Sequence, residues 1–559
     1  PAKAPALRGE IWTLIQAAQL DHDLGLDAAP DDAVFDEFVL HVDGWLCEIK
    51  DAQIRDGLHI LGRTPEGDEL INLVLAVLRS SQIFGGQVNG VSGLRTALGL
   101  GDETSLPEVD AVEAQARELV ATLAEASWSA DAVPEIVERI VGAPNEAAAA
   151  ALRFACQEVI PRLSRTGDEI SAILHALEGG YVPAGPSGSP LRGLINVLPT
   201  GRNFYSVDPK AIPSRMAYQT GQAMAESLLQ RHLDEAGEYP QSVGLSVWGT
   251  SAMRTSGDDI AEVLALLGVM PVWDDASRRV VGLEAIDLTE LARPRIDVTV
   301  RISGFFRDAF PHVVTMLDDA VRLVADRDEP SHLNFVRQHT QDDLAAHGDE
   351  RRARTRIFGS KPGSYGAGML PLIEAGNWRN DHDLAEVYSA WGGFAYGRDL
   401  DGIPARQDME ANYRRIAVAA KNVDTREHDI ADSDDYFQYH GGMVATVRAL
   451  TGVEPKAYVG DSTTPDSVRT RSLTEETARV FRARVINPRW ITAMQRHGYK
   501  GAFELAATVD YLFGFDATAG VVTDWMYAQL AENYVLDKDN QDFMKHANLW
   551  ALRGIIEKL

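Results

Sequence analysis

The sequence predicts a multidomain α/β protein that is mostly helical and carries a Rossmann-like α/β unit in its middle. Three observations lead to this prediction. The chain has 559 residues, which is too many for a single hydrophobic core. Its first third places apolar residues at helical spacing. From residue 242 onward, short β-branched runs alternate with amphipathic helices, which is typical of a partly parallel sheet.

We expect three consecutive domains along the chain. Residues 1–180 form a mainly helical domain with a candidate active-site segment, residues 181–330 an α/β domain, and residues 331–559 a mixed, mostly helical domain. The segment YVPAGPSGSPLRG (181–193) marks the first boundary, because its Pro, Gly and Ser content is typical of an irregular connection.

In the first domain, the segments 42–54 and 69–80 (ELINLVLAVLRS) predict helices. The Ala-rich segment 146–160 predicts another, with Asn145 as its N-cap and Pro161 after it. The intervening segment SQIFGGQVNGVSG predicts a glycine-rich loop.

The α/β domain is predicted from five short segments. Strands are expected at 243–247, 270–273 and 296–302, and helices at 258–267 and 310–324. Two acidic residues at the start of the first helix favour its dipole. The charged stretch 326–356 that follows this domain is expected to be mobile.

Composition narrows the possible partners. The formal net charge is −29, so nucleic acid and anionic membrane surfaces are not expected partners. Two cysteines fit a reducing cytoplasm, which is the expected location. No apolar run is long enough to span a bilayer. The chain lacks an initiator Met and ends inside an apparent helix, so we expect a piece of a longer protein.

Familiar nucleotide and zinc motifs are absent from the sequence. The segment IFGSKPGSYGAG resembles a phosphate loop, but Pro362 follows Lys361 where a Walker loop needs Ser or Thr and an opening helix. There is no G-x-G-x-x-G after a strand, and no H-E-x-x-H or C-x-x-C. If ATP drives this protein, a partner must hydrolyse it.

Three segments could carry chemistry. The loop DTREHDIADSDDYFQYHGG (424–442) mixes imidazoles and carboxylates, which suits a borderline cation such as Co²⁺ better than Mg²⁺; its simpler interpretation is a solvated acidic loop. The run CEIKDAQIRDGLH contains Glu48 and His59, although a lone Glu or His is usually a surface or core group. The segment WGTSAMRTSGDD follows a predicted strand, where α/β folds bind ligands, and Arg254 could bind a carboxylate there; an ordinary strand-to-helix loop is the alternative.

Four long segments together resemble one family. They are LPTGRNFYSVDPKAIPS, SVWGTSAMRTSGDDIAEVLALLGVMPVWD, RPRIDVTVRISGFFRDAFP and AYVGDSTTPDSVRTRSL. They resemble the C-terminal half of the large, macrocycle-binding subunit of aerobic cobaltochelatase, and the same places are similar to the large subunit of magnesium chelatase. The residues of the segments NFYSVDPKAIPS, SAMRT and DYFQYHGG resemble cobaltochelatase more than magnesium chelatase.

The resemblance implies an ATP-dependent metal chelatase of cobalamin (vitamin B12) biosynthesis. Such a subunit binds hydrogenobyrinic acid a,c-diamide and inserts Co²⁺, its substrate metal, into the corrin ring. The implied partners are an AAA+ ATPase subunit, which hydrolyses ATP with Mg²⁺, and a metal-site-bearing subunit. Two alternatives remain: a magnesium chelatase subunit that inserts Mg²⁺ into protoporphyrin IX, and a non-catalytic tetrapyrrole-binding scaffold.

The resemblance also implies roles for individual residues. The stretch EIKDAQIRDGLHILG matches a family segment whose glutamate is implicated at the macrocycle. Glu48 is therefore expected to act as a base or metal-delivery ligand, with His59 beside it. Candidates for binding the substrate's peripheral acid groups are Arg202, Arg254 and Asp258. Candidate metal ligands are His428, His440, Asp432 and Asp435.

Overall fold

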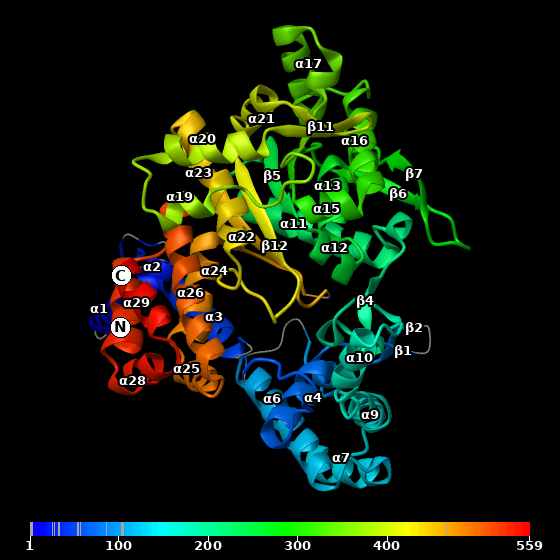
Figure 1. Cartoon of the computed structure of the whole chain (residues 1–559), viewed down its shortest axis with the longest axis vertical. Helices are drawn as coiled ribbons and strands as arrows, with labels where there is room; N and C mark the ends of the chain where they lie inside the picture. Colours follow the sequence, from blue (N-terminus) through cyan, green and yellow to red (C-terminus); the bar gives the residue numbers. More distant parts are fainter. Residues whose placement is uncertain are drawn as a thin grey trace. The chain divides into compact units, whose positions relative to one another are not determined.

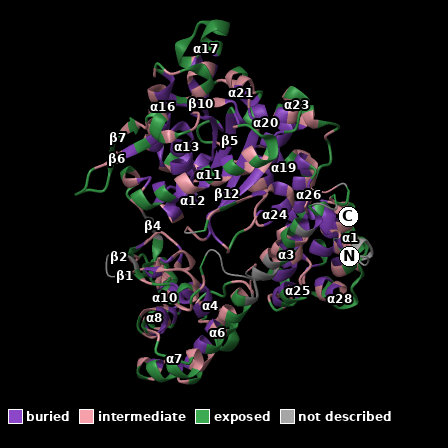
Figure 2. Cartoon of the chain, turned by 180° about the vertical axis from the view of Figure 1, so that it is seen from behind, coloured by how far each residue is buried: buried purple, intermediate pink, exposed green. Residues whose placement is uncertain are grey.

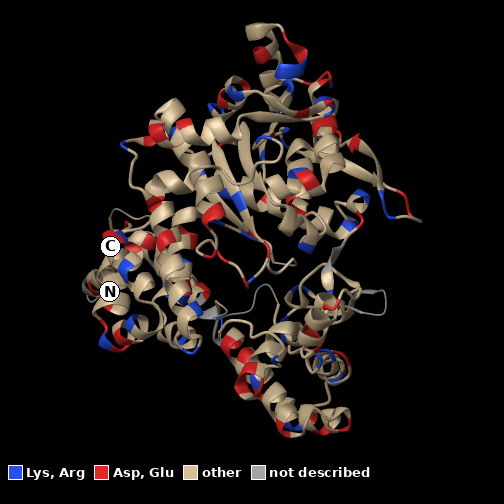
Figure 3. Ribbon diagram, viewed as in Figure 1, with Lys and Arg blue, Asp and Glu red and all other residues tan. Residues whose placement is uncertain are grey.

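The computed structural model describes residues 4–24, 26, 28–31, 34–52, 55, 57–84, 87–101, 106–465 and 467–559 (Figure 1). The chain divides into two compact units. Unit 1 comprises Pro1–Gly57, Asp208–Ser462 and Asp466–Leu559, and unit 2 comprises Leu58–Val207 and Thr463–Pro465. Acidic and basic residues are interspersed along the helices of both units (Figure 3). None of the described helices has the length and apolar character needed to cross a membrane.

This division differs from the three consecutive domains expected from the sequence. The first 57 residues belong to unit 1, because helix α3 (Phe35–Asp51) packs on α24 (Leu473–Val480) from the far end of the chain. The predicted domain boundary at residue 181 lies inside unit 2, where Ala184–Pro186 forms strand β3 beside β4 (Asn203–Ser206). The contact between α3 and α24 joins residues hundreds of positions apart, which local composition does not report.

The core of unit 1 is an eight-stranded sheet with five parallel strands at its centre. In spatial order these are β9 (Ile357–Gly359), β8 (Asp297–Ile302), β5 (Ser242–Val247), β12 (Val418–Val423) and β13 (Lys456–Asp461). The first strand in the chain, β5, thus lies in the middle of the five, as in a doubly wound Rossmann sheet. The predicted α/β class is confirmed.

Antiparallel strands close both edges of this sheet. Strands β10 (Phe394–Gly397) and β11 (Leu400–Pro404) follow β9 on one side, and β14 (Arg469–Ser472) pairs with β13 on the other.

The central strands are buried over their whole length because helices cover both faces of the sheet. Every residue of β5, β8 and β12 is buried, including the polar residues Asp297, Thr299 and Arg301 that alternate with apolar ones in β8 (Figure 2). Helices α11 (Arg215–Ala236), α13 (Asp258–Leu267) and α16 (Pro311–Ala325) pack side by side. Helix α23 (Gly442–Thr451) connects the parallel strands β12 and β13, so a right-handed crossover places it on the opposite face, where α20 (Asp381–Gly392) packs against it.

Two local predictions in this region need correction. The predicted strand 270–273 is real but leaves the main sheet: β6 (Val269–Trp273) forms an antiparallel hairpin with β7 (Val280–Ala285). The charged stretch 326–356, which was expected to be mobile, contains the helices α17 (Phe335–His347) and α18 (Glu350–Ala353). Its last residue, Arg356, forms a buried ion pair with Asp297 at 2.8 Å.

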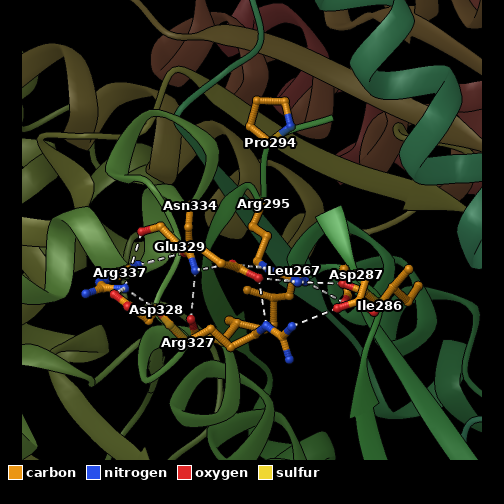
Figure 4. A network of polar contacts seen from close by, with 12 residues as sticks. Leu267, Ile286, Asp287, Pro294, Arg295, Arg327, Asp328, Glu329, Asn334 and Arg337 are labelled. Carbon is orange, nitrogen blue, oxygen red and sulfur yellow. Dashed lines mark hydrogen bonds and ion pairs between the residues drawn. The ribbon is translucent and has the colours of Figure 1, made fainter. Parts of the chain in front are cut away.

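A buried arginine network shows how those charges are used (Figure 4). Arg295, which is 0% exposed, donates to both carboxylate oxygens of Glu329 at 2.7 and 2.9 Å. It also donates to the carbonyls of Leu267, Gly268 and Ile286, which end α13 and follow β7. The Arg295 guanidinium therefore joins four segments of the chain. It also donates to backbone carbonyls at the C-terminus of α13, which have no partner within the helix.

Unit 2 is mainly helical, as predicted for this part of the chain. Its apolar core is formed by α4 (Gly67–Arg79), α6 (Leu106–Glu125), α7 (Val133–Val141) and α8 (Glu146–Phe154). The Asn145 side chain accepts a hydrogen bond from the Ala148 amide at 3.0 Å, so the predicted N-cap is confirmed.

Two further predictions in unit 2 are corrected by the structure. The Ala-rich helix continues beyond Phe154 through a π-helical turn into Ile160–Leu163, so Pro161 lies inside a continuous helical run, directly after the π-helical turn. The predicted loop at 81–93 contains two paired strands, β1 (Gln82–Phe84) and β2 (Gln87–Val91).

Candidate functional site at the carboxyl edge of the sheet

The chain order of the parallel strands creates a crevice between β5 and β12. From β5 the chain runs through β8 to β9 on one side, and later through β12 to β13 on the other. The segments that leave β5 and β12 therefore diverge at the carboxyl edge, which is where open α/β sheets bind ligands.

A polar pocket of about 110 Å³ lies at this crevice. From the β5 side it is lined by residues of helix α12 (Gly249–Thr255) and the residue before it, and from the β12 side by the strand end and the loop beyond. Its lining residues are Trp248, Thr250, Ser251, Arg254, Asn422, Asp424, Ser433, Asp435 and Tyr436. The segment WGTSAMRTSGDD predicted from the sequence thus forms one wall.

The turn between α12 and α13 depends on glycine. Ser256 has φ 59° and Gly257 has φ 104°, so the chain reverses through two left-handed residues. A Cβ at Gly257 would lie 2.7 Å from the Ile212 side chain. This turn places Arg254 at the end of α12 and Asp258 at the start of α13.

Arg254 is already engaged by a carboxylate of this chain. Its Nε and Nη2 donate to the two carboxylate oxygens of Asp424 at 2.8 and 2.9 Å, so the pair is bidentate and bridges the crevice. Substrate binding by Arg254 stays a prediction, and it would require a substrate acid to share or displace Asp424. Asp258 is 1% exposed and accepts a hydrogen bond from Ser462, which places it behind the pocket wall.

Two further carboxylates are buried below the pocket. Asp259 and Glu262 are 2% and 1% exposed, and the amide nitrogen of Asn422 donates to both, at 2.9 and 2.6 Å. Burial raises the pKa of Asp259 to about 7 and that of Glu262 to about 8. At neutral pH the pair therefore retains a proton.

Aromatic rings and a lysine surround the other side of the pocket. The Trp248 ring packs edge-on against Tyr436, and the Lys421 ammonium lies 3.8 Å from the Tyr436 ring centroid. Burial lowers the pKa of Lys421 to about 8. Asp435 lines the pocket as well, and burial together with Asp434 raises its pKa to about 6.

The acidic loop after β12 is organised by arginines. Arg55 donates to both carboxylate oxygens of Asp432 at 2.8 and 2.9 Å and to the Glu427 carbonyl at 2.8 Å. Arg484 holds Asp429 in a bidentate pair with both distances 2.7 Å. Asp432 thus serves as an ion-pair partner that connects the segment after α3 to this loop.

The two predicted histidine ligands have different surroundings. His428 is exposed on the loop, whereas His440 is 0% exposed in a π-helical turn that packs against the central strand β12. The Nε2 of His440 lies 3.0 Å from the Ala419 carbonyl and must donate to it, which leaves the Nδ1 lone pair as an acceptor. Nowhere in the described residues do three or more His, Cys, Asp or Glu side chains form a group that could hold a metal ion. The metal role of His428, His440, Asp432 and Asp435 stays a prediction.

His440 gives a pH-dependent stability. Burial lowers its pKa to about 4 from an ordinary 6.5, so the unfolded chain binds a proton that the folded chain does not. Stability should fall as the pH drops from 6.5 to 4, by about 3 kcal/mol from this residue at roughly 1.4 kcal/mol per pKa unit. Urea unfolding of His440→Gln at several pH values should lack this component.

The control for that experiment is His428→Gln, which removes an exposed histidine from the same loop region. It should retain the wild-type pH dependence. If both variants follow the wild-type curve, His440 is not a buried neutral histidine in the folded protein.

Glu48 lies in α3 and belongs to a second ionic cluster at the same edge. Its carboxylate accepts hydrogen bonds from Arg469 at 2.9 Å and Arg471 at 2.8 Å, both on β14. Arg471 also donates to Asp461, at the carboxyl end of β13, at 2.9 Å. Glu48 thus contacts β14, and Arg55 contacts the acidic loop after β12.

His59 and Arg202 belong to unit 2, whereas Glu48 belongs to unit 1. His59 Nε2 lies 2.9 Å from Glu169, which also accepts from the Gly62 amide and so orients the imidazole. The Arg202 guanidinium donates to the carbonyls of Asn196 and Leu198 and supports its own loop. The expected pairing of His59 with Glu48 and the substrate role of Arg202 stay predictions.

A family model described as CobN/Magnesium Chelatase matches residues 1–559. The chain belongs to this family. The aerobic cobaltochelatase subunit CobN of Pseudomonas aeruginosa is 44% identical over the whole chain, which covers 47% of that protein. A magnesium-chelatase subunit of Chlorobaculum parvum is more distant, at 29% identity over 94% of the chain and 43% of that protein.

A solved structure agrees with the family assignment. The catalytic subunit of cobaltochelatase from Mycobacterium tuberculosis is 68% identical and superimposes with a TM-score of 0.96, covering 100% of this chain and 47% of that one. The chain therefore spans about half the length of the CobN relatives it matches. The resemblance predicted from the sequence is confirmed at the level of the family.

Several site residues of this CobN-like chain were not predicted from the sequence. The Asp259 and Glu262 pair was available as an i, i+3 spacing at the start of an apolar helix, where both acids face one way. The only sequence signal for Asn422 was the polar pair Lys421–Asn422 near the end of the otherwise apolar strand VAAKNV. Glu169 had no sequence signal, because its partner His59 is 110 residues away.

Proposed function

We propose that this chain is part of the large subunit of an ATP-dependent cobaltochelatase, and that the subunit binds hydrogenobyrinic acid a,c-diamide and inserts Co²⁺ into its corrin ring during cobalamin biosynthesis. The observation that carries this proposal is the similarity, over all of this chain, to a protein described as a cobaltochelatase catalytic subunit. Greater identity to CobN than to the magnesium-chelatase relative favours cobalt over magnesium.

The geometry of unit 1 supports a chelatase site at the carboxyl edge. Insertion requires an acceptor for the protons of the ring nitrogens and groups that exchange water ligands on the metal. Carboxylates and hydroxyls line the pocket, and the Glu48 cluster adjoins the ends of β13 and β14. At about 110 Å³ the pocket is too small for a tetrapyrrole, whose sites typically exceed about 300 Å³. The ring would therefore lie over this edge rather than in the pocket.

We propose that another subunit binds and hydrolyses ATP. We expect an AAA+ ATPase, working with Mg²⁺, and a second, metal-site-bearing partner, because the sequence holds no Walker loop. Phosphate release by the purified chain should stay at background. Release at a rate comparable with an AAA+ motor would contradict this assignment.

The test of the proposed function is metal insertion in the reconstituted complex. The complete large subunit is mixed with its candidate ATPase partners and ATP, and absorption spectra follow the metallation of the corrin and of protoporphyrin IX. We expect Co²⁺ insertion into the corrin only. Mg²⁺ insertion into protoporphyrin IX would identify a magnesium chelatase, and ring binding without metallation of either ring would identify a scaffold.

A further inference from the structure

The pocket at the crevice has the properties of a site for water. Its volume of about 110 Å³ holds a few water molecules at roughly 30 Å³ each. Two buried polar atoms of its lining have no hydrogen-bond partner among the described residues: the amide oxygen of Asn422, whose side chain is 7% exposed, and the indole nitrogen of Trp248. One is an acceptor and the other a donor, and water can satisfy both.

The pocket leads directly to the buried carboxyl pair. Ser251 lines the pocket and lies near Asp259, and Asn422 lines it and donates to both Asp259 and Glu262. The Ser251 hydroxyl is therefore placed to pass a proton between water in the pocket and the pair. The close packing of α11 against α13, where a Cβ on Gly221 would lie 2.5 Å from the Glu262 amide, shields the other side of the pair.

The charges around the pair keep one proton in place. Asp258 on α13 and Asp424 after β12 add negative potential, and Lys421 on β12 adds positive potential. No salt bridge joins either carboxylate to a cation among the described residues. Two carboxylates that share a single amide donor, out of contact with solvent, cannot both ionise at low cost. The singly protonated pair still has one carboxylate able to accept a proton.

We propose that Asp259 and Glu262, bridged by Asn422, form a proton-accepting pair that takes up one proton released by the macrocycle during metal insertion, through water in the pocket and Ser251. This inference rests on the proposed chelatase function. As a ring N–H bond breaks, its electron pair binds the metal and its proton moves along the water and the Ser251 hydroxyl to the ionised carboxylate. The pair later returns the proton to solvent by the same route.

The first test is spectroscopic and needs no partner subunits. Infrared spectra of the chain in H₂O and D₂O, over a range of pH, should show a protonated-carboxyl band that persists at neutral pH and disappears in alkaline solution. Glu262→Gln should remove this alkaline titration. Asp259→Asn serves as a second variant if the first does not fold. A band and titration identical to wild type in both folded variants would overturn the proposal.

The second test measures insertion in the reconstituted complex. With corrin affinity retained, Glu262→Gln should lower kcat about tenfold or more and abolish the acid limb of the pH–rate profile, where the doubly protonated pair no longer accepts a proton. Glu262→Asp should recover part of the rate. The matched control is Asp318→Asn, another buried carboxyl of raised pKa on α16, and it should insert cobalt normally.

The outcomes separate this proposal from the proposed function. Cobalt insertion by the wild type, with an unchanged rate and pH profile in Glu262→Gln, would overturn the proton-accepting pair and leave the chelatase assignment intact. Failure of the wild type to metallate either ring would overturn both.

Discussion

Glu48→Gln should reduce cobalt insertion by about 10²-fold or more while leaving corrin affinity unchanged. Glutamine keeps the size and hydrogen bonding of the side chain but removes its charge and its capacity to accept a proton, and a positioned acid–base group typically contributes this much. The measurement is single-turnover metallation in the reconstituted complex, beside a corrin titration monitored by Trp fluorescence. Glu48→Asp should recover only part of the rate, because the carboxylate is withdrawn by one methylene.

The ion pairs of Glu48 with Arg469 and Arg471 supply the control for that experiment. Asp461→Asn removes another carboxylate from Arg471 without touching Glu48. If the charge balance around Arg471 were the only role of Glu48, the two variants would lose the same activity. Insertion at the wild-type rate by Glu48→Gln would make the residue structural, and the loop with His428 and His440 would become the leading site.

Arg295→Met should destabilise unit 1 by about 3–5 kcal/mol. The substitution conserves volume but leaves Glu329, 9% exposed, without its bidentate partner, and it leaves the carbonyls of Leu267, Gly268 and Ile286 without their donor. Removing one partner of a buried ion pair is costly because the remaining charge stays desolvated. Guanidinium unfolding monitored by circular dichroism should show the loss as a lower midpoint.

The matched control is Arg327→Met, since Arg327 donates to the same carboxylate from a position that is 34% exposed. A partly solvated pair contributes at most about 1 kcal/mol, so this variant should remain close to wild type. Equal losses in the two variants would show that the network of Figure 4 does not depend on the burial of Arg295.

The sequence by itself determined the features that depend on short-range patterns. The helix 258–267 has the predicted bounds, and Asn145 caps its helix, because periodicity and capping involve residues within a few positions of one another. A short apolar segment predicted β5, and a β-branched segment predicted β8. Long, unusual motifs identified the family, and the position of Arg254 after a strand indicated the edge at which a ligand would bind.

Only the tertiary structure decided which of these segments meet. The order of the strands brings β5 beside β12, and Asn422 thereby reaches Asp259 and Glu262 across about 160 residues of sequence. The acids that looked like a metal-binding loop are paired with Arg55 and Arg484, from the two ends of the chain. Such pairs depend on three-dimensional distance and on burial, which sets the cost of each charge. Neither quantity is encoded in local spacing, so the burial of the carboxyl pair, its contact with Asn422 and the arginine networks could be found only in the folded chain.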